Sequence, residues 1–141
     1  MENLFVEIVS PNGSIFRGEA SSVQAPGVEG SFEVLRDHAP MISAIEYGPI
    51  RVTTVKGEEI IFATSGGFLE VLNNSVSILA ETAELSSEID VERAREAERQ
   101  ALEMLSSTMD EEERERYEEA LNRARSRARV AMGSVGSGRK S

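Results

Sequence analysis

The sequence predicts an α+β protein, in which an antiparallel β-sandwich or flattened barrel precedes an αα-hairpin. All four prolines and eight of the eleven glycines lie before residue 68, and residues 68–132 contain neither. Before this change, apolar residues come in short alternating runs or brief bursts; after it, they recur every three or four residues. We expect a sandwich domain over residues 1–86, a hairpin over 87–132 and a flexible tail over 133–141.

Short apolar runs in the first half indicate β-strands, because strand side chains alternate between two faces. These runs are Leu4–Val9, Ser22–Ala25, Ile50–Val55, Glu59–Phe62, Gly67–Leu72 and Val76–Leu79. Turn residues separate them at Pro11–Gly13, Gly27–Gly30, Lys56–Glu58 and Asn73–Ser75. The pairs Lys56-Gly57 and Asn73-Asn74 tolerate the positive φ of tight hairpin turns, so antiparallel pairing is expected there.

The second half has the period of two α-helices. Its apolar positions are Val91, Ala94, Ala97, Ala101, Leu102 and Leu105, and then Tyr117, Ala120, Leu121, Ala124, Ala128 and Ala131. Residues 106–110 connect the two helices, and Asp110 is placed to cap the second. Because this seam is mostly alanine, each contact buries little apolar area, and the hairpin is expected to be marginally stable by itself.

Composition excludes several classes of function. The chain has no cysteine and one histidine, so it forms no disulfide, thiolate metal site or multi-histidine site. Its net charge of −10 argues against general affinity for nucleic acid or anionic lipid. Residues 1–88 hold 13 acids and 4 bases, a net charge of −9, so most of the negative charge lies in the expected sandwich. No apolar run is long enough to cross a bilayer, so any membrane role requires another protein.

Two motifs could indicate a nucleotide site or a catalytic site. The tail from Gly133 to Ser141 nearly matches a phosphate-binding loop, but Arg139 interrupts the motif, and we expect no helix after it. Asp37 and His38 could serve a small enzyme, yet no serine forms a nucleophile elbow and no third group is evident. We therefore expect no autonomous active site and no metal.

The arginines of the second helix allow two interpretations. At 100° per residue, Arg123 and Arg127 share one face, and Arg125 and Arg129 share another. In one interpretation they are solvated, and either pair with the acids between Glu111 and Glu119 or favour the helix C-terminus. In the other, Arg123 and Arg127 form an anion clamp, because the guanidinium fork matches phosphate geometry.

Five motifs in order carry a family resemblance. They are Gly27–Leu35, His38–Pro40, Gly48–Val52, Ser65–Val71 and Asn74–Ala80. In this order and spacing, and followed by a helical hairpin, they resemble the ε subunit of bacterial-type F-type ATP synthases. The resemblance implies a ten-stranded β-sandwich followed by two helices, and a non-catalytic role in ATP synthesis and proton transport.

The same resemblance implies partners and a location. The chain would lie in the central stalk of the rotor, bound to the γ subunit and resting on the ring of c subunits, with Gly27 and Gly30 in the ring-facing loop. The hairpin would either fold back or extend along γ, where it would contact the catalytic α and β subunits and inhibit ATP hydrolysis. The complex would sit on the cytoplasmic face of the bacterial plasma membrane.

A narrower match suggests regulatory ATP, acting as a ligand with no cofactor required. Residues 89–94 fit the Ile/Leu-Asp-x-x-Arg-Ala pattern of ε subunits that bind ATP. The residues at matching positions are Glu84, Ile89, Asp90, Arg93, Ala94, Arg123 and Arg127. Gln100 departs from the pattern, since ATP-binding relatives can carry arginine there. Asp90 also suits a simpler role as helix N-cap.

An alternative from a different class is a free-standing binding module or chaperone. Its acidic sandwich would recognise a basic partner, and it would be a stable monomer without affinity for γ. Co-purification with γ distinguishes the two hypotheses.

Overall fold

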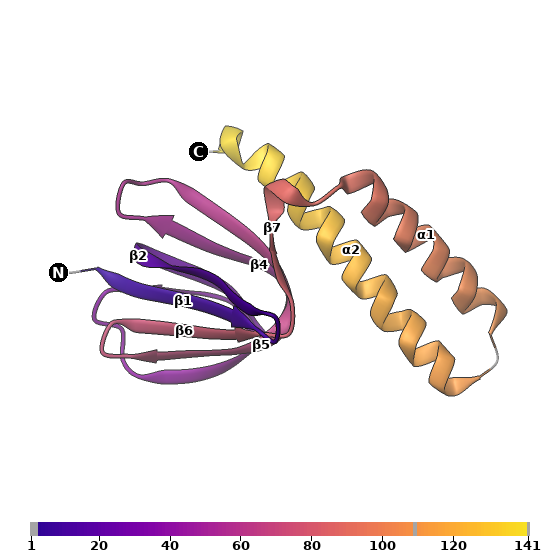
Figure 1. The fold of residues 1–141 in the computed structure, drawn as a ribbon, viewed down its shortest axis with the longest axis horizontal. Helices are drawn as coiled ribbons and strands as arrows, with labels where there is room; N and C mark the ends of the chain where they lie inside the picture. The colour runs from indigo at the N-terminus through magenta and orange to yellow at the C-terminus, as the bar shows by residue number, and fades with distance from the viewer. Residues whose placement is uncertain (1–2, 109, 141) are drawn as a thin grey trace. The chain divides into compact units, whose positions relative to one another are not determined.

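The computed structural model describes residues 3–108 and 110–140, with side chains described as far as Gly133. The chain forms two compact units, Met1–Leu85 and Ser86–Ser141, and each is considered by itself (Figure 1). The first contains all the strands and the second all the helices. This order confirms the predicted α+β fold class.

The first unit is one highly bent sheet. Its strands are β1 (Leu4–Ser10), β2 (Gly13–Gly27), β3 (Gly30–Leu35), β4 (Met41–Thr54), β5 (Glu59–Leu72), β6 (Ser75–Ala80) and β7 (Ala83–Leu85). The hydrogen-bonded order is β1-β6-β5-β4-β2-β3, with β7 against β5. Because β1 also pairs with β2, the five strands β1, β6, β5, β4 and β2 close into a ring. The unit is therefore a flattened barrel with two opposed layers.

Among the described residues there are seven strands, so the expected count of ten is wrong. The difference arises because three long strands continue from one layer into the other. The first part of β2 pairs with β1 and its second part with β3 and β4. Likewise, β5 pairs with β7 near its start and with β6 near its end. The third long strand, β4, pairs with β5 along nearly its whole length. The predicted runs Glu59–Phe62 and Gly67–Leu72 are consequently parts of one strand.

Glycine makes the corner of β5. Gly66 and Gly67 have φ values of 118° and 145°, in the region that L side chains rarely adopt. A Cβ on Gly67 would clash with the carbonyl oxygen of Leu79 on β6. The missing side chain thus permits the close approach of β6.

A single apolar core fills the space between the layers. Both layers contribute to it: Leu4, Val6, Ile8, Ala20, Val23, Ala25, Val34, Ile45, Ile50, Val52, Phe62, Leu69, Val71, Val76, Ile78 and Ala80. All of these precede residue 86, so the sandwich has a core of its own.

The predicted turns are confirmed, and two strands were missed. Asn73 and Asn74 have φ values of 50° and 64°, as a tight hairpin requires, and Gly57 has a φ of 89°. The alternation of apolar and polar residues did not predict β3 or β7. Strand β7 is only three residues long, and β3 begins directly after the Gly27–Gly30 turn.

The second unit comprises a 3₁₀ turn, η1 (Ser86–Glu88), and the helices α1 (Val91–Ser107) and α2 (Glu111–Lys140). Both helices were predicted, but α2 continues through residues 133–140, where a flexible tail was expected; Ser141 lies outside the described residues. The glycines there lower helix propensity without removing backbone donors, as proline would, so helical hydrogen bonding can continue.

Candidate functional site

The first helix of the hairpin begins at a capping aspartate. Asp90 has an extended backbone, with φ −84° and ψ 106°, and its carboxylate accepts a hydrogen bond from the Arg93 backbone N–H at 3.2 Å. The Ala94 N–H donates to the Asp90 carbonyl at 3.0 Å. The N-cap interpretation of Asp90 is therefore confirmed.

The second helix begins in the same way. Asp110 accepts from the Glu112 N–H at 3.2 Å through its side chain, and its carbonyl accepts from the Arg114 N–H at 2.9 Å. The Thr108 hydroxyl donates to the Glu113 carboxylate at 2.8 Å, which ties the loop to the first turn of α2. The predicted cap at Asp110 is confirmed.

Small side chains form the seam between α1 and α2. The buried seam residues are Ala94, Ala101, Leu121, Ala124, Ala128 and Ala131. Two predicted members are wrong, because Ala97 is exposed and Leu102 is 44% exposed. The contact face of α1 is centred on Ala94 and Ala101, and Leu102 lies about 100° away from Ala101 on the helix.

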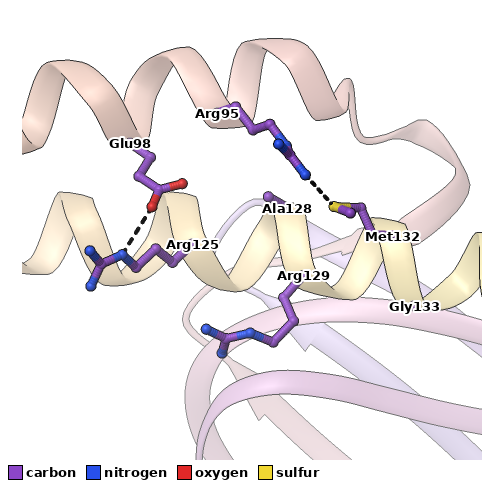
Figure 2. A pocket seen from close by; sticks show the side chains of 7 residues that line it. All are labelled: Arg95, Glu98, Arg125, Ala128, Arg129, Met132 and Gly133. Carbon is purple, nitrogen blue, oxygen red and sulfur yellow. Dashed lines mark hydrogen bonds and ion pairs between the residues drawn. The ribbon is translucent and has the colours of Figure 1, made fainter.

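Two side-chain contacts set the antiparallel register of the hairpin (Figure 2). The Arg125 Nε donates to Glu98 Oε2 at 3.1 Å, and Arg95 Nη2 lies 2.9 Å from the sulfur of Met132. Each contact joins α1 to α2. The expected pairing of these arginines with acids of the same helix is therefore wrong for Arg125, because its partner is on α1.

These contacts flank an open groove of about 520 Å³ between the helices. It is lined by Arg95, Glu98, Arg125, Ala128, Arg129, Met132 and Gly133. None of the seven residues suggested for ATP binding lines this groove. The i, i+4 spacing of Arg125 and Arg129 places both arginines on one face of α2, but Arg123 and Arg127 have the same spacing, so the sequence does not show which pair lines a groove.

The residues suggested for ATP binding are distributed along the hairpin. Ile89 and Ala94 are buried at the start of α1, whereas Arg93 and Arg123 are exposed and Arg127 is half-buried. The contact between Glu98 and Arg125 places these two residues at the same height along the antiparallel hairpin. Arg127 then lies at about the height of Glu96, and Arg123 at about the height of Gln100.

The remaining member, Glu84, belongs to the other unit. It lies on β7 in register with Ala63.

An exposed polar cluster extends over about two turns of α1, from Glu96 to Glu103. Arg99 donates to the carboxylate of Glu96, Gln100 donates to the same oxygen at 3.3 Å, and Arg99 lies 3.7 Å from Glu103. The hydrogen bond from Arg99 lowers the pKa of Glu96 below its usual value. Gln100, the departure from the ATP-binding pattern, therefore supports an intrahelical contact.

On the sandwich, Gly27 and Gly30 end the strands on either side of the suggested ring-facing loop and pair with each other. Gly30 has a φ of 126°, which requires glycine. Gly27 is required for another reason, since a Cβ there would lie 2.7 Å from the Gly30 carbonyl oxygen. Between them, Val28 is 55% exposed. The loop thus presents an apolar side chain on a tightly constrained turn.

A row of apolar side chains crosses the outer face of the second layer. The sheet register aligns Ala44, Phe68, Leu79 and Val9 on neighbouring strands, and we name these four residues the outer strip. Phe68 and Leu79 are 58% and 56% exposed, although their chain neighbours Leu69 and Ile78 are fully buried. An apolar row of this kind is typical of a protein-binding surface.

Asp37 and His38 do not form a catalytic pair. Asp37 is engaged with Asn74, and His38 Nδ1 donates to the Ala39 carbonyl at 2.8 Å. Over residues 3–108 and 110–140, no group of three or more histidine or acidic side chains could hold a metal ion. In the same part of the chain, no helix is long and apolar enough to cross a membrane.

Comparison with known families and sequences gives a consistent result. Residues 3–86 match the beta-sandwich domain of the ATP synthase delta/epsilon chain, and residues 87–132 match its long alpha-helix domain. The ATP synthase epsilon chain of Salinibacter ruber is 55% identical over 96% of both chains. That of Syntrophomonas wolfei is 40% identical over 89% of this chain and 92% of the relative.

Solved structures share the fold. A chain in the Euglena gracilis mitochondrial ATP synthase structure has a TM-score of 0.79 at 23% identity, covering 89% of this chain and 79% of that one. Together, the fold and the sequence matches define a non-catalytic ATP synthase subunit. The chain belongs to the ATP synthase delta/epsilon chain family and is of the bacterial epsilon type.

Proposed function

We propose that this subunit couples the rotor of a proton-translocating ATP synthase to its c-ring, and that its hairpin restrains ATP hydrolysis. The observation that carries the coupling role is the outer strip. Phe68 and Leu79 are exposed on the sheet surface. Burying them would be favourable by roughly 25 cal/mol per Å² of apolar area removed from water. Burial against the γ subunit removes this cost.

Co-purification tests the γ contact. The full chain should co-purify with γ, and the double variant Phe68→Glu plus Leu79→Glu should lose γ, because two charges would be buried against the partner. Val55→Glu is the control, since Val55 is also 51% exposed but lies at the β4–β5 turn, outside the outer strip. Equal retention of γ by both variants would contradict the docking face, and the absence of any γ binding would favour a free-standing module.

The loop between Gly27 and Gly30 is the proposed contact with the c-ring. Its exposed Val28 and constrained backbone suit a fixed point of contact. Replacing both glycines with valine should strain the turn by about 1 kcal/mol or more at Gly30 and force Gly27 away from its neighbours. We expect weaker ATP-driven proton pumping with γ binding retained. Parallel loss of both would indicate misfolding instead.

The hairpin is proposed to act as a brake with two arrangements, one folded back and one extended along γ toward the α and β subunits. The contact between α1 and α2 consists mostly of alanines, which supports this proposal. Such a contact buries little apolar area, so the folded-back hairpin gains little stability from it. Ending the chain after Ser87 leaves the whole sandwich core in place. The assembled enzyme should then keep γ and hydrolyse ATP faster; loss of γ would contradict this division of labour.

ATP is proposed as a regulatory ligand that stabilises the folded-back hairpin. The proposed residues are Glu84, Ile89, Asp90, Arg93, Ala94, Arg123 and Arg127. Arg123→Ala plus Arg127→Ala should weaken ATP binding in calorimetry, without phosphate release. Asp90→Ser separates the two roles of Asp90: it keeps the helix cap, so loss of ATP binding with unchanged helix content would assign the carboxylate to the ligand.

The proposed location is the cytoplasmic face of the bacterial plasma membrane, reached through the complex. The net charge of −10 supports attachment through protein partners, since anionic lipid repels it. Washed membranes should release this subunit only together with γ. Release of the subunit alone would contradict attachment through γ.

A further inference from the structure

We propose that Met132 is an oxidation site, and that its oxidation by a peroxide strengthens the contact between α1 and α2. Met132 lies on α2 and is 47% exposed. Its sulfur is 2.9 Å from Nη2 of Arg95 on α1 (Figure 2). An accessible thioether is thus also one of the two side-chain contacts that set the register of the hairpin. This inference concerns the hairpin alone and does not depend on the proposed function.

The contact between Arg95 and Met132 pairs a strong donor with a weak acceptor. A thioether sulfur accepts hydrogen bonds weakly, whereas a guanidinium is a charged donor that favours oxygen acceptors. Among the residues whose side chains the structure describes, Arg95 has no other acceptor. The acid that lines the same groove, Glu98, pairs with Arg125 instead. Arg95 therefore has donor capacity that a stronger acceptor at position 132 could use.

Oxidation of Met132 supplies an oxygen acceptor at this position. One oxygen atom passes from hydrogen peroxide to the sulfur: the O–O bond breaks, an S–O bond forms, and the other oxygen leaves as water with both hydrogens. The sulfur loses two electrons and the peroxide gains them, so the step needs no further reactant. Because the methionine side chain is unbranched and rotatable, the new oxygen can turn toward the Arg95 guanidinium.

The sulfoxide should hold the two helices together more firmly than the thioether does. Its oxygen accepts a charge-assisted hydrogen bond from Arg95, and the half-exposed position spares the polar group from complete burial. The seam of the hairpin is mostly alanine, so one stronger contact across it has a large relative effect. The pairing of α1 with α2 would then respond to peroxide, and a methionine sulfoxide reductase would reverse the response.

Met104 provides a matched comparison in the same hairpin. It lies near the end of α1 and is 44% exposed, close to the value for Met132. Among the described residues, no side chain donates a hydrogen bond to its sulfur. Because exposure governs access of the oxidant, peroxide should oxidise both methionines. Only the product at Met132 should strengthen the hairpin.

Thermal unfolding of the full chain before and after treatment with hydrogen peroxide tests the proposal. In the Met104→Leu variant, oxidation should raise the melting temperature of the helical signal in far-UV circular dichroism by about 4 °C. In the Met132→Leu variant, oxidation should produce no rise. Both variants keep the remaining methionines, which therefore serve as a common background. Peptide mass spectrometry should find the sulfoxide at Met132; a Met132 that stays reduced while Met104 is oxidised would show that the proposed site is wrong.

Replacing Arg95 in the Met104→Leu background separates the proposed hydrogen bond from a general effect of the sulfoxide. Arg95→Leu keeps an apolar side chain but no donor, so the rise on oxidation should disappear. Arg95→Lys keeps a single charged donor group and is the milder variant, in which the rise should be smaller. Treatment of the oxidised chain with a methionine sulfoxide reductase should restore the original melting temperature. A melting temperature that falls or stays unchanged when Met132 is oxidised, or a rise that persists in full without Arg95, would overturn the inference.

Discussion

Asp37 and Asn74 hold two turns of the sandwich together by reciprocal hydrogen bonds. The Asp37 backbone N–H donates to Asn74 Oδ1 at 2.6 Å, and Asn74 Nδ2 donates to Asp37 Oδ1 at 3.3 Å. Both residues have positive φ, 65° for Asp37 and 64° for Asn74. Asp37, a candidate catalytic acid from the sequence, thus joins the β3–β4 connection to the β5–β6 connection.

Replacing Asn74 should destabilise the sandwich for two separable reasons. Asn74→Ala loses both side-chain hydrogen bonds and places a Cβ at positive φ, so we expect a loss of about 1–2 kcal/mol. Asn74→Gly loses the hydrogen bonds but relaxes the backbone, and should cost less. Urea unfolding measures both. If alanine and glycine cost the same, the backbone conformation is not part of the effect.

Gly67 should be the least replaceable glycine of the β5 corner. Gly67→Ala puts a Cβ against the backbone of Leu79 as well as into a left-handed conformation, and we expect a loss of about 3 kcal/mol or more. Gly57→Ala is the control: its φ is also positive, at 89°, but open space surrounds it, so about 1 kcal/mol is expected. Similar losses of stability in both variants would show that the close contact with β6 does not add to the cost of replacing Gly67.

Local chemistry predicted much of the fold. The Asn73-Asn74 turn, the caps at Asp90 and Asp110, and the alanine seam all follow from short-range rules. The corner of β5 was not predicted as such, because Gly66 and Gly67 look like a break between strands, whereas tertiary packing uses them to continue one strand into the other layer.

The groove could not be located from periodicity alone. Arg123 and Arg125 lie about 100° to either side of Ala124, so both arginine pairs flank the seam. The flank that forms the groove is set by the side chains of α1 that contact α2. These are Glu98, which contacts Arg125, and Arg95, which contacts Met132. The outer strip was likewise missed, since exposed Phe68 and buried Leu69 are indistinguishable by residue type.

Acid should weaken the polar cluster on α1. Arg99 lowers the pKa of Glu96, so this carboxylate stabilises the helix above its unfolded pKa, and the contribution is lost as pH falls through the lowered folded value. Glu96→Gln should therefore reduce helix stability at pH 7, by an amount that vanishes in acid. Circular dichroism from neutral pH to below the ordinary glutamate pKa of 4.5 measures this. In an Arg99→Gln background the pH-dependent difference should be absent; its persistence would assign it to another group.

Gly133→Ala should stabilise α2. Glycine inside a helix costs roughly 0.5–1 kcal/mol relative to alanine, and here the added Cβ meets nothing within 4 Å, so no packing loss offsets the gain. Thermal unfolding followed by far-UV circular dichroism should show the hairpin melting at higher temperature. Gly27→Ala is the opposite control, because its Cβ would lie 2.7 Å from the Gly30 carbonyl oxygen and should destabilise the sandwich. An unchanged or lower melting temperature for Gly133→Ala would mean that residue 133 is not part of a continuous helix in solution, and that α2 ends where the sequence predicts the tail.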